Sequence, residues 1–335
     1  MSKAHSAGLL PIIAAFAGNI LVSLAKLFGF FITGSGAMFS EAIHSLADTA
    51  NQFLLLVGVT QSTKKASTLH PYGHGRERYI WALISACGIF FLGCGVTVYH
   101  GVSTLLEKHE FTFSIWAVII LIISFVVESF TLWLAYHEIR QRFPRAKWKT
   151  INEEADPSTM AVVFEDGLAV FGVLIALASI GLAKLTGHAY WDSIGSIIIG
   201  VLLGIVAVVL INKNRHYLIT KSIPHAMAEE VKEILLADPA IEKIFDFKSA
   251  IFDADRYLIK CEVEFNAPAL MKDMDKYHFL ANGYADVQGD KEEFKKFCVD
   301  YLDRVPRLVG SRIDEIEKKI KDRFPQIVFI DIEIN

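Results

Sequence analysis

Long apolar segments separated by short polar connections follow one another up to residue 211. A helix needs about 20 apolar residues to cross the hydrocarbon core of a bilayer, so windows of that length predict membrane-spanning helices. Six such spans are predicted, at residues 8–33, 37–62, 79–106, 112–139, 158–184 and 191–211. The pattern therefore predicts a six-helix transmembrane bundle over residues 1–211.

The pattern changes after residue 211, where charged residues become frequent. An amphipathic helix is predicted at 224–236, strands at 241–252 and 256–265, a helix at 306–324 and a strand at 326–334. A polar segment, 267–305, precedes the second of these helices and is predicted to be helical at 290–302. Residues 212–335 are therefore predicted to form a small α/β domain with an inserted segment.

Basic residues mark one side of the predicted bundle. Lysine and arginine are frequent in the connections after the second, fourth and sixth spans, whereas the opposite connections contain only Lys108 and Lys184. Because connections rich in these residues stay in the cytoplasm, both termini and the α/β domain are expected there. We expect an integral protein of a bacterial-type inner (plasma) membrane.

The composition is typical of a membrane protein. Of 335 residues 53% are hydrophobic, and the mean hydropathy of +0.39 is too high for an ordinary soluble domain. The expected surrounding is the lipid bilayer, and a net charge of −4 gives no reason to expect a nucleic-acid partner. The four cysteines form no C-x-x-C pair, which argues against a thiolate zinc site or a disulfide framework.

The second predicted span carries two ionisable residues, His44 and Asp48. Positions four apart lie on one face of a helix, so this imidazole and carboxylate can converge on one ion. Asp48 lies about 17 Å into the span, near the middle of a hydrocarbon zone about 30 Å thick. An ionisable residue there costs at least ~2.5 kcal/mol and marks an ion pathway by default. The alternative is a pair that only joins neighbouring helices by hydrogen bonds.

The fifth predicted span adds two adjacent acids, Glu165 and Asp166. Adjacent residues point about 100° apart around a helix, so both cannot face one partner squarely. Both lie about 11 to 12 Å into the span, which is too deep for two solvent-facing carboxylates. Together with His44 and Asp48 they supply three or four ligands suited to a divalent first-row metal.

Other polar residues have competing interpretations. Lys26 lies near enough to a span end to snorkel toward the interface, and Glu128 is either a proton-handling or a helix-packing group. Asp192 begins the sixth span, where it is expected to cap the helix. His70 and His74, in the loop after the second span, are weaker metal candidates because a loop does not stack them as a helix would.

These features resemble the cation diffusion facilitator family over nearly the whole chain. The resemblance rests on the six spans, GSGAMFSEAIHSLADTANQ in span two, HPYGHGRER after it, the acids of span five and the C-terminal domain. It implies a ferredoxin-like, copper-chaperone-like fold for that domain and a transport site with an H-x-x-x-D motif, which His44 and Asp48 match. The inserted segment resembles the branch that includes the zinc transporter 9 type.

The chain departs from the family pattern at two positions. The family usually has a second H/D-x-x-x-D motif in span five, and aligning Asp166 with its last acid leaves Val162 in place of the other ligand. Glu165 or a water molecule is then expected to fill that position. Some members also bind metal in the loop after span two through an acid upstream of two histidines, and Ser67 replaces that acid here.

The resemblance implies a homodimeric secondary transporter that moves a divalent cation, zinc first, out of the cytoplasm in exchange for protons. Metal binds to neutral imidazole and ionised carboxylate, so loading displaces protons and protonation ejects the metal. We expect no enzymatic activity and no cofactor, the metal being the substrate. The alternatives are manganese, iron or cobalt as cargo, a membrane-embedded metalloenzyme, and a metal-responsive scaffold without transport.

Overall fold

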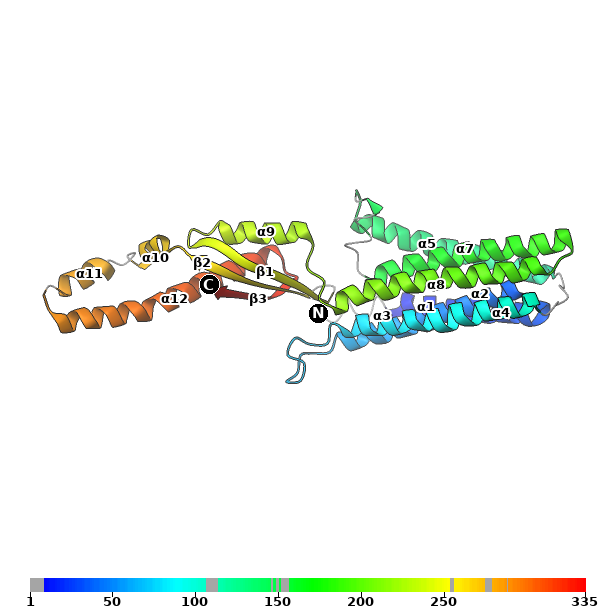
Figure 1. Ribbon diagram of the computed structural model, residues 1–335, viewed down its shortest axis with the longest axis horizontal. Helices are drawn as coiled ribbons and strands as arrows, with labels where there is room; N and C mark the ends of the chain where they lie inside the picture. Colours follow the sequence, from blue (N-terminus) through cyan, green and yellow to red (C-terminus); the bar gives the residue numbers. More distant parts are fainter. Residues whose placement is uncertain are drawn as a thin grey trace. The chain divides into compact units, whose positions relative to one another are not determined.

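The structure, a computed structural model, describes residues 9–106, 114–145, 147–148, 151, 157–253, 256–274, 279–287 and 289–335. The chain forms two compact units, Met1–Ile219 and Thr220–Asn335, and each is described by itself. In its described residues the first unit is helical, whereas the second combines strands with helices (Figure 1).

The first unit is a bundle of long helices that run side by side (Figure 1). Its elements are α1 (Leu9–Thr33), α2 (Gly36–Ser62), α3 (Glu77–Gly88), the π-helix η1 (Ile89–Val96), α4 (Thr97–Leu106), α5 (Ile115–Arg142), α7 (Pro157–Thr186) and α8 (Tyr190–Leu218). Since α3, η1 and α4 follow one another without a break, the described residues of this unit form six helical rods.

The helical rods of this unit expose many large apolar side chains. Four rods in the described residues are long and apolar enough to cross a membrane, namely Glu77–Leu106, Ile115–Gln141, Val162–Thr186 and Tyr190–Leu218. The other two predicted spans, at α1 and α2, are not among these four. Large apolar side chains are exposed on the rods, including Phe91 (69%), Val126 (62%) and Phe171 (64%). Such a surface suits contact with lipid, and the unit is an integral membrane domain.

Helix α2 lies inside the bundle, where it packs against α1, α3, α7 and α8. A tight turn places it there, because Gly34 has a φ of +63°, a backbone region that glycine adopts readily, directly after the end of α1. Ser35 then caps α2, its side chain accepting a hydrogen bond from the backbone N–H of Met38. The span predicted at 37–62 corresponds to this helix.

Close crossings hold α8 against α4. A Cβ on Gly101 would lie 3.1 Å from the backbone nitrogen of Ile197, and one on Gly200 would lie 3.1 Å from that of Val98. The missing side chains let the two backbones approach, as in other membrane helix pairs. The preceding π-helix, η1, also packs against α8 and α2. Helices of this type are rare and are often found near functional sites.

The second unit is a three-stranded sheet with helices, an α/β fold as predicted. Strands β1 (Ile241–Asp253), β2 (Arg256–Phe265) and β3 (Ile327–Ile334) lie in the order β1-β2-β3, the first pair antiparallel and the second parallel. Helix α9 (His225–Leu236) precedes β1, while α10 (Ala267–Met274), α11 (Phe279–Asp286) and α12 (Lys291–Arg323) connect β2 to β3. Fully buried Leu235, Ile259 and Ile316 join α9, β2 and α12 in its core.

The predicted start of the last helix is wrong. Helix α12 begins at Lys291, where Asp290 caps it by accepting hydrogen bonds from two backbone N–H groups, and it continues through Pro306. Proline is frequent in the first turn of a helix, where its missing N–H is not needed, but here it lies in the interior. The inserted segment 267–305 therefore comprises α10, α11 and the first part of α12, while its residues 275–278 and 288 lie outside the described residues.

Candidate functional site

A buried carboxylate from α8 holds the start of α2. Asp192 accepts a hydrogen bond from the Ser35 hydroxyl at 2.7 Å and further ones from the backbone N–H groups of Gly36 and Ala37. A helix N-terminus stabilises negative charge through its free N–H groups and its dipole. The prediction that Asp192 caps its own helix is wrong, because the N-cap of α8 is Ala189 and the Asp192 carboxylate binds α2 instead.

His44 and Asp48 lie next to each other on α2, with His44 Nε2 3.5 Å from Asp48 Oδ2. His44 is 1% exposed, whereas the Asp48 side chain is 18% exposed. Asp48 lines a cavity of the bundle, and His44 does not. The pair therefore shares one helix face, as a spacing of four predicts, with the carboxylate at the cavity and the imidazole enclosed.

Glu165 and Asp166 on α7 turn toward different helices. Glu165 accepts a hydrogen bond from the side-chain amide of Asn51 on α2, and Asn51 accepts one from the Ser85 hydroxyl at 2.5 Å. Asp166 lies within hydrogen-bonding reach of the Thr131 hydroxyl on α5. This divergence agrees with the angle of about 100° between adjacent helix positions.

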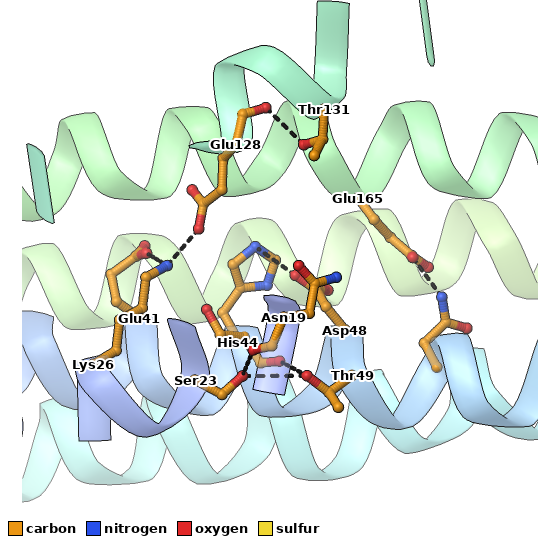
Figure 2. A network of polar contacts seen from close by, with 12 residues as sticks. Asn19, Ser23, Lys26, Glu41, His44, Asp48, Thr49, Glu128, Thr131 and Glu165 are labelled. Carbon is orange, nitrogen blue, oxygen red and sulfur yellow. Dashed lines mark hydrogen bonds and ion pairs between the residues drawn. The ribbon is translucent and has the colours of Figure 1, made fainter. Parts of the chain in front are cut away.

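A cavity of about 330 Å³ lies among α1, α2, α5 and α7. Five carboxylates from three helices line it, namely Asp48 of α2, Glu165 and Asp166 of α7, and Glu128 and the exposed Glu138 of α5. Figure 2 shows Asp48, Glu128 and Glu165 on the facing helices. Buried carboxylates without opposite charges are expensive, so a cavity with this lining favours a cation.

The cavity extends toward one end of the bundle. Its wall on α5 runs from Glu128 past Thr131 to Glu138, which corresponds to about 15 Å along the helix. On α2 the wall runs from Ser45 past Asp48 to Gln52, also toward the C-terminal end of the helix. The connections that follow α2 and α5 carry the clustered basic residues. The cavity therefore runs from the interior of the bundle toward the end with the basic connections.

A buried triad of charges adjoins the cavity (Figure 2). Lys26 Nζ of α1 lies 2.8 Å from Glu41 Oε2 of α2 and 2.6 Å from Glu128 Oε1 of α5. The side chains of Lys26 and Glu41 are fully buried, and that of Glu128 is 13% exposed. The prediction that Lys26 snorkels is wrong, because its ammonium group contacts two carboxylates inside the bundle instead of reaching water.

Sequence-based reasoning missed Glu41 and left the role of Glu128 open. The available signal was the presence of charges of both signs inside apolar segments, since such charges pair with one another in membranes. The pattern does not say which charges meet, because positions 26, 41 and 128 lie on three different helices.

The carboxylates border one cavity without meeting at one point. Within the described residues, no three His, Cys, Asp or Glu side chains lie close enough together to hold a metal ion. Of the four predicted ligands, the two on α2 are in contact, whereas Glu165 on α7 binds Asn51 instead of either of them. Joint binding of one ion by α2 and α7 therefore requires side chains or helices to move.

The two histidines of the loop after α2 form a separate pair. The rings of His70 and His74 lie with their centroids 4.5 Å apart, and reciprocal backbone hydrogen bonds between Ser67 and His70 close a turn beside them. Neither histidine lines the cavity. Their role as a second metal site stays a prediction.

A membrane bundle with an internal cavity lined by carboxylates belongs to the class of proteins that handle cations within the bilayer. The sequence profile of a known family, described as the cation efflux transmembrane domain, matches residues 12–219. Because this match covers more than half of the chain, the chain belongs to the cation diffusion facilitator (cation efflux) family. The resemblance seen in the sequence is thereby confirmed.

Curated relatives include proteins of animals, plants and bacteria. The chain is 36% identical over 329 residues to the human "Proton-coupled zinc antiporter SLC30A9, mitochondrial", covering 96% of this chain and 58% of the relative. It is 33% identical over 324 residues to "Metal tolerance protein C4" of Arabidopsis thaliana, covering 94% of this chain and 71% of the relative. A shorter match, 34% over 91 residues, relates 27% of the chain to 28% of "Magnetosome protein MamM" of Paramagnetospirillum magneticum. The chain thus spans less than two thirds of the human relative.

Proposed function

We propose that this chain is a secondary active transporter that moves a divalent metal ion, zinc first, out of the cytoplasm in exchange for protons. The observation that carries the proposal is the cavity lined by carboxylates from three helices inside a membrane bundle. Carboxylates at that depth require metal ions or protons to balance their charge. The human relative, whose name describes a proton-coupled zinc antiporter, supports zinc as cargo and protons as the counter-ion.

We propose His44, Asp48 and Asp166 as ligands of the transported ion, with Glu165 as the fourth. Asp48, Glu165 and Asp166 line the cavity, and His44 is in contact with Asp48. Imidazole nitrogen and carboxylate oxygen together suit Zn²⁺. His70 and His74 are a weaker candidate for a separate site, because two nearby imidazoles supply half of a tetrahedral set.

The coupling to protons follows from the chemistry of these ligands. Imidazole binds metal when neutral and carboxylate when ionised, so a proton competes with the metal at each ligand. Metal bound from one side displaces protons, and protons arriving from the other side release the metal. If the cavity opens to each side of the membrane in turn, this competition becomes an exchange of metal for protons. Joint binding of one ion by α2 and α7 requires side chains or helices to move, and such a movement is compatible with alternating access.

We propose six spans over residues 1–211, with both termini and the α/β domain of residues 212–335 in the cytoplasm. Helix α2 contains 27 residues, enough for about 40 Å, and its hydropathy is lowered by the residues of the site itself. The basic connections support this orientation, and the cavity runs toward the same end. We further propose a homodimer in an inner (plasma) membrane of bacterial type, to be tested by cross-linking and membrane fractionation.

A cargo of manganese, iron or cobalt is the second candidate. The acids that line the cavity supply oxygen donors, and His44 lies outside the lining. Oxygen-rich sites suit Mn²⁺ better than imidazole-rich ones do, so competition between metals decides the cargo. A scaffold that binds metal without moving it makes the opposite prediction, an absence of flux.

The test is metal-driven proton movement in proteoliposomes that contain a pH dye. The wild type and Asp48→Ala are compared with zinc, manganese and iron, because Asp48 is the predicted ligand that both lines the cavity and contacts His44. We expect zinc to drive a proton flux that the variant loses. Metal movement without proton movement would exclude exchange, and no metal movement in correctly oriented protein would exclude transport.

A further inference from the structure

We propose that Glu128 of α5 is an additional oxygen ligand for the transported metal ion and that Lys26 holds it at the cavity wall. This inference rests on the proposed function and assigns a ligand to a helix other than α2 and α7. It starts from the position of Glu128, which lines the same cavity as Asp48, Glu165 and Asp166.

The charges of the buried triad do not balance. Lys26 carries one positive charge and contacts two carboxylates, at 2.8 Å for Glu41 and 2.6 Å for Glu128. The Glu41 side chain is fully buried and does not line the cavity, so it is the enclosed counter-ion of Lys26. Glu128 is the carboxylate in excess, and its side chain is the one that borders the cavity. A cation in the cavity would supply the missing charge.

The two oxygens of Glu128 have different surroundings. Oε1 accepts the hydrogen bond from Lys26, whereas Oε2 is buried and has no hydrogen-bond partner among the described residues. Across the cavity Glu165 shows the same arrangement, because its Oε2 binds Asn51 and its Oε1 is buried without such a partner in the described part of the chain. Glu165 is 6% exposed. Two walls of one cavity thus each present a buried carboxylate with one oxygen available for a ligand.

Glu128 of α5 lines the same cavity as the predicted ligands on α7, while its Oε1 contacts Lys26. Thr131 follows Glu128 by three positions and lies on the same helix face, and its hydroxyl is within hydrogen-bonding reach of Asp166. On α7 itself the aliphatic Val162 lines the cavity and offers no donor atom. Beyond the four proposed ligands, Glu128 of α5 is therefore a further oxygen donor at the wall of the same cavity.

The experiment measures metal binding to the full chain purified in detergent, using the absorption spectrum of Co²⁺ and its displacement by Zn²⁺. Glu128→Gln removes the charge while Lys26 keeps Glu41 as its partner, so the remaining pair is neutral. Glu128→Asp keeps the charge but shortens the side chain. The matched control is Glu138→Gln, because Glu138 lines the same cavity from the same helix but is exposed. Asp48→Ala reports whether binding occurs at the proposed site.

We expect Glu128→Gln to weaken Co²⁺ binding by more than tenfold and to change the Co²⁺ spectrum, with Glu138→Gln unchanged. Glu128→Asp should change affinity and spectrum in the same direction, which provides the test if the glutamine variant does not fold. Wild-type affinity and spectrum in a folded Glu128 variant, together with loss of binding in Asp48→Ala, would overturn this inference and leave the proposed function intact. Equal weakening of Co²⁺ binding in Glu138→Gln would mean that only the total negative charge of the cavity matters. That result would also overturn the inference. No metal binding by the wild type would refute both proposals.

Discussion

At the scale of single residues, His44 and Asp48 share a helix face but differ in their access to the cavity. Asp48 lines it, whereas His44 is almost fully enclosed and reaches the cavity through its contact with Asp48. The imidazole is the nitrogen donor of the predicted ligand set, and nitrogen donors favour Zn²⁺ over Mn²⁺. We therefore predict that His44 influences the choice between the two cargoes more than the acids do.

Replacement of His44 by aspartate should shift this preference. The His44→Asp variant keeps a ligand at the same spacing but makes the set all oxygen, so we expect the ratio of zinc to manganese flux to fall by roughly tenfold. Parallel flux measurements in proteoliposomes give the ratio. Ser45→Ala, a neighbouring change in the cavity lining, serves as the control. An unchanged ratio in His44→Asp would contradict a selective role for the imidazole.

Lys26 is predicted to be essential for the stability of the bundle. In Lys26→Met, Glu41 remains fully buried without its cation. Removing one partner of a buried ion pair lowers the free energy of unfolding by about 3–5 kcal/mol. We expect a large fall in the unfolding temperature in detergent, and substantial recovery in the double variant Lys26→Met with Glu41→Gln. If the single variant is as stable as the wild type, the triad does not stabilise the fold.

The ion pairs also show which contacts between residues can be predicted from the sequence and which cannot. The spacing of His44 and Asp48 predicts their contact because both lie on one helix. Lys26 and Glu128 are separated by 102 positions in the sequence and meet only when α1 packs near α5. Hydropathy places each residue at a depth but not beside a particular neighbour, so the sequence favours snorkelling of Lys26, whereas the structure pairs it with two carboxylates.

At the scale of elements, most of the regular structure follows from local patterns. The strand predicted at 256–265 has the observed bounds of β2, because its alternation is uninterrupted and turn residues flank it. The error at α12 has a local cause as well. Pro306 is a strong start signal, but the helix continues through it because the cap at Asp290 and the apolar positions on both sides support one long helix.

The crossing of α4 and α8 gives a prediction for glycine. In Gly200→Ala the new Cβ would lie 2.8 Å from Val98 Cγ2 and 3.1 Å from its backbone nitrogen, and overpacking of this kind costs about 1–3 kcal/mol. Gly181→Ala in α7 is the control, because no described atom lies within 4 Å of its Cβ. Thermal unfolding in detergent should separate the two variants. Equal unfolding temperatures of the two variants would mean that α4 and α8 can move slightly apart with little loss of stability.

At the scale of the whole molecule, the second unit has its own hydrophobic core, and the reactivity of a buried cysteine in that core reports whether the unit is folded. Cys261 lies on β2 at 1% exposure, and burial raises the pKa of its thiol to about 11. The thiolate is the reactive form, so a raised pKa leaves about one molecule in a thousand reactive at pH 8. Cys298 on α12 is partly exposed.

We therefore expect a maleimide at pH 8 to label Cys298 well before Cys261 in the folded protein, as measured by mass spectrometry of peptides. Denaturant should abolish the difference, because it exposes both thiols. Rapid labelling of Cys261 without denaturant would show that the sheet opens under native conditions.

The cavity has a consequence for the electrical behaviour of the membrane. The carboxylates that line it are groups of the protein itself, and they remain in it throughout a transport cycle. If one divalent ion leaves and two protons take its place, the occupied protein has the same net charge on its way out and on its way back. Such a cycle carries no current, so its rate would not respond to membrane voltage, which acts on net charge movement. For the proposed export, the number of carboxylates that take up protons would therefore decide whether a cell can drive it with its membrane potential or with its pH gradient alone.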